Sequence, residues 1–198
     1  MTEPIINQDS EPREFRFKTY PKIYSIGHEE NKELFSPDDD IVIQEKYDGT
    51  NARFYKHKDG YLVFGSHTQQ LGEGVEHKYA KSFQKWISYV QEHINLGEVP
   101  TGYIFYGEGM IPHTMSYDWD RIPSFIGYDI YSFNDDRFIN YLEVQGMYTR
   151  MSIPYVPTFA VIKGKDLTDI GINEDIIPVS QYSPHKAEGV VFKNYSKQ

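Results

Sequence analysis

A lysine beside a sharp turn is the first residue in this sequence that could do chemistry. The stretch EKYDGTN places Lys46 two residues before the turn-forming pair Asp48 and Gly49. A lysine amine, with a reference pKa of ~10.4, is almost always protonated at neutral pH, so it attacks phosphorus only beside cations or in a desolvated pocket. A strand end would fix its direction and leave it accessible, and Gly49 would let a phosphate approach the backbone. An ordinary turn with a lysine nearby is the alternative.

Three more charged residues stand at the ends of segments that are typical of strands. Glu108 ends one such segment in YGEGM, and Glu188 opens another in EGVVFK, which Lys193 closes. Successive side chains of a strand point to opposite faces, so a regular strand would direct Glu188 and Lys193 away from each other. A bend at Gly189 would let both reach one pocket. Taken singly, each could also be an exposed polar residue.

The elements that must position these residues begin with three consecutive strand predictions. Residues 41–47 (IVIQEKY), 51–57 (NARFYKH) and 60–65 (GYLVFG) are separated by two Asp-Gly pairs, which are typical of turns. The first pair lies between two strand-like runs and therefore predicts a two-residue β-hairpin. Asn51 and Arg53 would share one face of the second strand.

The rest of the chain carries two helical patterns among further strands. Apolar residues at helical spacing predict a helix over 77–94, and a second helix is predicted over 133–150. Further strands are predicted at 102–108, 125–132, 155–162 and 188–193. The fold class is therefore α+β, with largely antiparallel sheets and flanking helices. Residues 1–14 are polar with two prolines, and we expect a flexible arm ahead of a domain that spans 15–198.

Composition excludes several classes of function. The net charge of −9 argues against a protein that coats nucleic acid by bulk attraction, so a nucleic-acid role must depend on a local site. The chain has no cysteine, which excludes disulfides and thiolate metal sites. No apolar stretch has the length of a membrane span or the character of a signal core, so we expect a cytoplasmic protein with no membrane partner. Aromatic residues, at 16%, could build a core and offer surfaces for base stacking.

Four of these segments resemble, in order, the motifs of a known superfamily. EKYDGTN resembles the lysine–x–Asp–Gly signature of covalent nucleotidyltransferases, the ligases and capping enzymes, and FYGEG, FIGYDIY and EGVVFK resemble its next motifs. They extend from Lys46 to Lys193, which is most of the chain. Asn51 stands where DNA ligases commonly carry an arginine, and KYDGTN is similar to the RNA-ligase branch. The resemblance implies the adenylation domain of an ATP-dependent RNA ligase, with a nucleotidyltransferase (ATP-grasp-like) fold.

The resemblance also implies a mechanism. Lys46 would attack the α-phosphorus of ATP, expel pyrophosphate and carry AMP as a phosphoramidate. The AMP would pass to an RNA 5′-phosphate, and a 3′-hydroxyl would then displace it, so nicked or broken RNA ends are the expected partners. Glu188 would hold Mg²⁺ or Mn²⁺, Glu108 would contact ribose or metal, and Lys193 would meet the α-phosphate.

Five further residues receive roles around the nucleotide from the same resemblance. Glu45 would fix adenine, with Phe125 stacked on one side of the base and Val190 packed on the other. Asn51 is implicated in handling the RNA end, and Arg53 would reach ribose or phosphate. A core position for Phe125 and an ordinary surface position for Arg53 are the alternatives.

Some positions depart from the pattern of the family, and other functions stay open. His67 stands where many relatives carry an arginine. Relatives also have a fifth motif, with a lysine pair that handles the phosphates. The given sequence ends at Gln198, so we expect the domain to be truncated before that motif, and we do not expect Lys197 to replace the pair. Asp48 is expected to cap the turn or to orient Lys46. The alternatives are a GTP-dependent capping-type guanylyltransferase, a DNA ligase, and a non-catalytic module that binds nucleotide or RNA. A monomer is expected.

Overall fold

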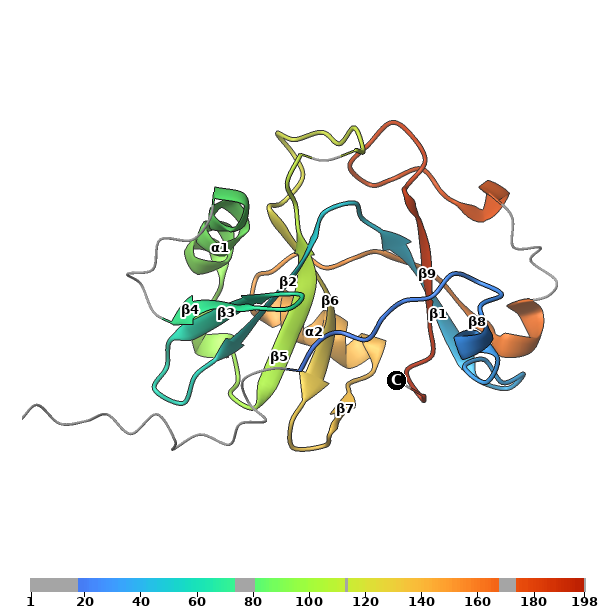
Figure 1. Ribbon diagram of the computed structural model, residues 1–198, viewed down its shortest axis with the longest axis horizontal. Helices are drawn as coiled ribbons and strands as arrows, with labels where there is room; N and C mark the ends of the chain where they lie inside the picture. The colour runs from blue at the N-terminus through green and yellow to red at the C-terminus, as the bar shows by residue number, and fades with distance from the viewer. Residues whose placement is uncertain (1–17, 74–80, 113, 168–173, 198) are drawn as a thin grey trace, which may run out of the picture.

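The computed structural model describes residues 18–73, 81–112, 114–167 and 174–197. The predicted arm, residues 1–14, lies outside these ranges, as do the first residues of the helix predicted over 77–94. Figure 1 shows two β-sheets, a larger one at the left and centre of the view and a smaller one at the right. No described helix is long and apolar enough to cross a membrane.

Every strand pairing in both sheets is antiparallel. The larger sheet has the order β4-β3-β2-β5-β6-β7 and the smaller has the order β8-β1-β9. The strands are β1 (Asp40–Lys46), β2 (Thr50–Lys56), β3 (Leu62–Ser66), β4 (Gln70–Glu73), β5 (Tyr103–Gly109), β6 (Phe125–Ser132), β7 (Arg137–Phe138), β8 (Thr158–Lys163) and β9 (Gly189–Lys193). Short 3₁₀ helices lie at Glu29–Asn31, Leu96–Glu98, Gly164–Leu167 and Glu174–Ile176. The predicted α+β class with antiparallel sheets is confirmed.

Helix α1 (Lys81–His93) forms because its apolar residues recur on one face. Trp86, Ile87 and Val90 are fully buried in a core that also contains Phe54 of β2. The side chains of α2 (Tyr141–Arg150) enter the same core, so both helices cover one face of the larger sheet. Burying each of these large side chains contributes about 1.5–3 kcal/mol to folding.

Helix α2 begins at Tyr141, eight residues after the predicted start at 133. The strand β7 and its turn occupy the intervening residues, which the helical pattern could not separate from the helix. Asn140 caps the helix by accepting hydrogen bonds from the backbone N–H groups of Leu142 and Glu143, and the Glu143 side chain completes a capping box. The cap fixes the boundary that periodicity left open.

The turn at Asp48 and Gly49 does not close a β-hairpin, contrary to the prediction. β1 pairs with β8 and β9 in the smaller sheet, whereas β2 pairs with β3 and β5 in the larger one. The turn therefore carries the chain from one sheet to the other. A Cβ atom on Gly49 would lie 2.7 Å from the carbonyl oxygen of Gly109, so the glycine is required by the close approach of β5.

Candidate active site

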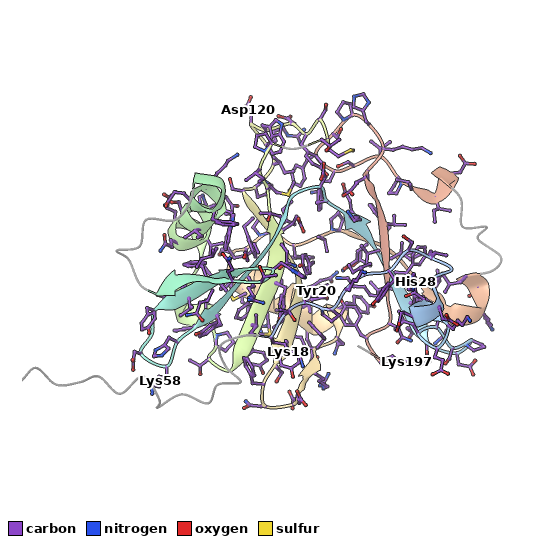
Figure 2. The ribbon with its side chains drawn as sticks, in the orientation of Figure 1. Lys18, Tyr20, His28, Lys58, Asp120 and Lys197 are labelled. Atoms are coloured by element: carbon purple, nitrogen blue, oxygen red, sulfur yellow. The ribbon has the colours of Figure 1, made fainter. Side chains whose placement is uncertain are left out.

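A cleft of about 310 Å³ lies where the two sheets meet. Residues of β1 and β9 line it from the smaller sheet, and residues of β2, β5 and β6 line it from the larger one. Residues 20–23, which precede β1, line it as well, and Figure 2 shows Tyr20 near the centre of the molecule. The described residues that line the cleft are Tyr20, Pro21, Lys22, Ile23, Gln44, Glu45, Lys46, Tyr47, Asp48, Gly49, Asn51, His67, Glu108, Tyr128, Val156, Val191 and Lys193.

Lys46 ends β1 and lines this cleft. The register of β1 and β9 pairs Lys46 with Gly189, and the Lys46 Nζ lies 2.5 Å from Glu188 Oε1. The Lys46 side chain is 44% exposed and the Glu188 side chain 32%, so both groups are accessible to a ligand. Glu188 precedes the first residue of β9, which removes it from the alternation of that strand. Glu188 contacts Lys46 but is not among the described residues that line the cleft, whereas Lys193 is.

Glu108 reaches the cleft from β5, directly across from Asn51 on β2. Burial raises the pKa of Glu108 to about 8, the positive charge of Lys46 opposes this shift, and the negative charges of Glu188 and Asp48 add to it. A carboxyl group with this pKa is largely protonated at neutral pH. It can therefore donate a hydrogen bond to a ligand oxygen as well as accept one.

Tyr128 is the aromatic residue of β6 that reaches the cleft, and sequence reasoning missed it. The Asn51 side-chain amide donates to the Tyr128 hydroxyl at 2.6 Å, which leaves the buried Asn51 Oδ1 without a hydrogen-bond partner in the described part of the chain. An unpaired buried acceptor in a cleft wall is suited to a donor from a ligand. The only signal for Tyr128 was its place in FIGYDIY.

Phe125 and Val190, the residues expected to enclose the base, are not brought to the cleft. Phe125 is fully buried in the core beneath the helices, where its ring lies 6.0 Å from that of Trp86. Val190 is absent from the described lining of the cleft, which Val191 and Val156 supply instead. Val190 pairs with the residue before Lys46 and so follows the opposite alternation from Val191.

A β-bulge explains the position of Tyr128. In the pairing of β5 with β6, Tyr106 lies opposite Asp129 while the next residue, Gly107, lies opposite Gly127, which leaves Tyr128 as the extra residue. Phe125 and Ile130 face the core on either side of this irregularity. The bulge directs Tyr128 and Asp129 to the cleft side together, which a regular strand could not do.

Glu45 lines the cleft, and Arg53 does not. Glu45 is 2% exposed; its Oε2 accepts from the Gln181 backbone at 3.3 Å, and its Oε1 has no hydrogen-bond partner within the described residues. Arg53 is buried behind the cleft, where its Nη1 donates to the Lys18 carbonyl at 2.9 Å. Burial lowers the pKa of Arg53. Its described hydrogen bond holds the chain that precedes β1.

Lys193 lines the cleft from β9, but its ammonium group is held by a carboxylate. The Nζ lies 2.8 Å from Asp129 Oδ2, and both side chains are almost wholly buried. Asp129 also accepts hydrogen bonds from the hydroxyl groups of Tyr20 and Tyr195. Burial lowers the pKa of Lys193, and the charge of Asp129 opposes that shift. The carboxylate therefore joins strands of both sheets beside the cleft.

Asp48 fixes the loop that follows β5. Its Oδ2 accepts from the backbone N–H groups of Thr114 and Met115, at 3.1 and 3.0 Å, and its own N–H donates to the Tyr117 hydroxyl. His67 lines the cleft. Lys197 lies elsewhere: its ammonium donates to the Glu33 carbonyl at 2.7 Å, and Figure 2 shows it at the lower right of the molecule.

The described residues contain no group of three or more His, Asp or Glu side chains arranged to hold a metal ion. Glu188 and Glu108 nevertheless interact electrostatically with each other and with Lys46. Mg²⁺ is commonly held by one or two carboxylates together with the phosphates of its substrate. Glu108 in the cleft lining and Glu188 beside Lys46 fit that arrangement better than a site made by protein alone.

Comparison with known proteins adds a family match and several similar structures. The family described as RNA ligase matches residues 39–198. An archaeal ATP-dependent RNA ligase superposes with a TM-score of 0.65 at 20% identity, over 92% of this chain and 46% of that one. A Naegleria gruberi RNA ligase mutant with ATP and Mn superposes with a TM-score of 0.53 at 17% identity, over 82% of this chain and 48% of that one. The Naegleria gruberi RNA ligase with PPi superposes with a TM-score of 0.58 at 15% identity, over 99% of this chain and 59% of that one.

These likenesses show a shared fold, because identity is below 25% in each case. The chain spans about half the length of the solved ligases that it matches. A search of curated proteins finds no match. The fold common to these structures is the nucleotidyltransferase fold that the four motifs predict.

Proposed function

Because this chain belongs to the RNA ligase family, we propose that it activates RNA ends for joining, with Lys46 as the nucleophile that takes AMP from ATP. The proposal rests on one observation: Lys46 and Glu108 line a cleft between two sheets, and the Lys46 amine lies 2.5 Å from Glu188 and within electrostatic reach of Glu108. The family match supports the further proposal that the substrates are nicked or broken RNA ends and that the activity serves RNA repair.

The first step forms a phosphoramidate. The Lys46 ammonium releases a proton to water, and the Nζ lone pair attacks the α-phosphorus of ATP. The bond from that phosphorus to the bridging oxygen breaks, pyrophosphate leaves, and the nitrogen releases its second proton. Glu188 orients the amine by accepting its hydrogen bond. Positioning of this kind is the main contribution that a protein makes to phosphoryl transfer.

The next two steps transfer the AMP. A phosphate oxygen at an RNA 5′ end attacks the same phosphorus and releases Lys46. A 3′-hydroxyl oxygen then attacks the RNA phosphate, forms the phosphodiester and expels AMP. Asn51 is suited to the RNA end, because its buried Oδ1 lacks a partner within the described residues.

Tyr128 and Glu45 are suited to the base. The Tyr128 ring supplies a flat surface at the cleft, and Val156 and Val191 supply apolar contacts. The unpaired Glu45 Oε1 would accept from the amino group of adenine. Guanine carries an oxygen acceptor at the corresponding atom, so this arrangement favours ATP over GTP.

Glu188 and Glu108 would hold Mg²⁺ or Mn²⁺, which when bound would neutralise charge on the phosphates. Structures of the Naegleria gruberi ligase contain ATP or AMP with Mn, which supports a divalent metal in this family. The protonated form of Glu108 suits contact with a ribose hydroxyl or a phosphate oxygen when no cation is bound.

The test is covalent self-labelling. The protein is incubated with Mg²⁺ and ATP labelled on the α-phosphate, then denatured and analysed for bound label. We expect label on the wild-type chain, none on Lys46→Ala, and undiminished label on Lys163→Ala, a control lysine paired with Asp40 at the edge of the smaller sheet. Equal labelling by GTP would favour a guanylyltransferase, and joining of nicked DNA in preference to RNA would favour a DNA ligase. Label that survives in Lys46→Ala would refute the assignment of the nucleophile.

A further inference from the structure

The segment before β1 forms a wall of the cleft that the family match does not include. Residues 18–23, here called the strap, precede the matched range 39–198. Four consecutive strap residues, from Tyr20 to Ile23, line the cleft. In Figure 1 the blue segment that contains the strap runs from the larger sheet toward the smaller one. A ligand in the cleft would therefore contact the strap as well as the two sheets.

The strap is fastened to the larger sheet at two points. The Lys18 carbonyl accepts hydrogen bonds from Arg53 Nη1 at 2.9 Å and from the Tyr106 hydroxyl at 2.7 Å. Tyr20 is buried, and its hydroxyl donates to Asp129. The Tyr20 ring packs edge-on against Tyr128 at 4.9 Å. These contacts involve main chain, side chain and ring, so the strap has a defined position beside the cleft.

The described lysines that line the cleft differ in whether an acidic side chain compensates their charge, and Lys22 of the strap is the exception among them. Lys46 is paired with Glu188, and Lys193 is paired with Asp129. Lys22 has no carboxylate partner among the described residues, and its ammonium group lies 4.9 Å from the centre of the Tyr24 ring. It is therefore the lysine of the described lining whose positive charge is not already compensated by an acid.

A nucleoside triphosphate brings several negative charges into a cleft whose other walls carry carboxylates. An uncompensated ammonium group gains the most from such a ligand, because it gives up no existing ion pair to bind it. The side chain is exposed, and it can leave the Tyr24 ring without leaving a buried charge unpaired. Among the cleft lysines it can thus meet a phosphate with the smallest rearrangement.

We propose that Lys22 is an additional phosphate-binding residue of this site, and that Tyr20 is the positioning residue which fixes the strap. The proposal rests on the proposed use of a nucleotide by the cleft. Tyr20 acts through Asp129 and Tyr128, whereas Lys22 contacts the ligand.

The experiment measures binding without reaction. The probes are α,β-methylene-ATP, which cannot release pyrophosphate, and adenosine, which has no phosphate, each titrated into the full chain by calorimetry. For Lys22→Gln we expect the Kd of the ATP analogue to rise about tenfold while the Kd of adenosine stays unchanged. Lys22→Arg should retain most of the affinity, and Lys32→Gln, whose exposed lysine pairs with Glu29, serves as the matched control. An unchanged Kd for the analogue, or an equal loss for adenosine, overturns the proposal.

Tyr20→Phe tests the positioning role, because it keeps the ring and removes the hydroxyl. We expect weaker binding of the ATP analogue and faster amide exchange in the strap, with Lys22 still present. If this variant loses only stability and binds the analogue as the wild type does, the positioning role is wrong. A wild-type chain that binds the analogue through Lys22 and never self-labels would refute the transfer function and leave the phosphate contact standing.

Discussion

Glu108 shows how strongly one side chain depends on its surroundings. It extends toward the cleft from β5, and the Gly49 backbone donates a hydrogen bond to it. Removal from water nevertheless outweighs both this bond and the nearby Lys46 charge, so its pKa rises to about 8. A residue identified in the sequence only as a carboxylate is, in the fold, an acid that titrates near neutral pH.

This shift predicts how stability changes with pH. The folded pKa of about 8 lies above the ordinary value of 4.5, so between these values the folded state keeps a proton that the unfolded state releases. The free energy of unfolding contributed by Glu108 therefore falls as pH rises from 5 to 8, by on the order of 3 kcal/mol. Glu108→Gln should remove this fall, as measured by urea unfolding at pH 5, 6.5 and 8. Glu98→Gln, at an exposed glutamate, is the control, and an unchanged slope in Glu108→Gln would contradict the assignment.

The positions of single residues could be predicted from the sequence where a motif specifies them. They could not be predicted where contacts with residues far away in the chain specify them. The order of the motifs placed Lys46 near Glu188, and the structure has them in contact. Asp129 received no role, because its partners Tyr20 and Lys193 lie 109 and 64 positions away in the chain. No local pattern encodes contacts at such separations.

The pairing of the strands and their irregularities determine which side chains face the cleft. The Asp-Gly turn has the local chemistry of a hairpin, but β1 already has partners on both sides in the smaller sheet. Turn chemistry sets the sharpness of the reversal, whereas the two sheets set where the chain goes next. The bulge in β6 acts similarly, because one extra residue changes which side chains face the cleft. Periodicity assumes regular strands and so misses both features.

The bulge predicts opposite outcomes for two aromatic residues of β6. Tyr128→Leu should weaken binding of the ATP analogue about tenfold or more, because stacking on an aromatic ring contributes ~1–3 kcal/mol per base. Phe125→Leu should lower the free energy of unfolding by about 1–2 kcal/mol, since the residue is fully buried, and should leave binding intact. Calorimetry and urea unfolding of both variants measure the two effects. If Phe125→Leu weakens binding more than Tyr128→Leu does, the placement of the base is wrong.

At the scale of the whole molecule, the cleft exists because two sheets meet along it. The turn before β2 joins the sheets covalently, and Lys193 of β9 joins them through its pair with Asp129 of β6. The Tyr20 hydroxyl donates to the same Asp129 carboxylate and so attaches the strap to this joint. The α+β class follows from the hydrophobic periods in the sequence. The division of the strands between two sheets does not, because β9 pairs with β1 from the far end of the chain.

The joint between the sheets predicts a non-additive effect on stability. Asp129→Asn or Lys193→Met each removes one partner of a buried ion pair, so each should lower the free energy of unfolding by about 3–5 kcal/mol. The double variant leaves no uncompensated charge and should cost less than the sum of the two, with a coupling of about 1–3 kcal/mol.

The matched control for this cycle is the exposed pair of Lys163 with Asp40. Its side chains are 49% and 65% exposed, and the corresponding substitutions should each change stability far less than those of the buried pair, because water screens an exposed pair. Urea unfolding of both sets measures the difference between a pair that joins two sheets and a pair at the surface. The surface pair should behave additively. If the buried pair does so as well, then Asp129 and Lys193 do not hold the sheets together. The walls of the cleft must in that case be fixed by the turn and the strap alone.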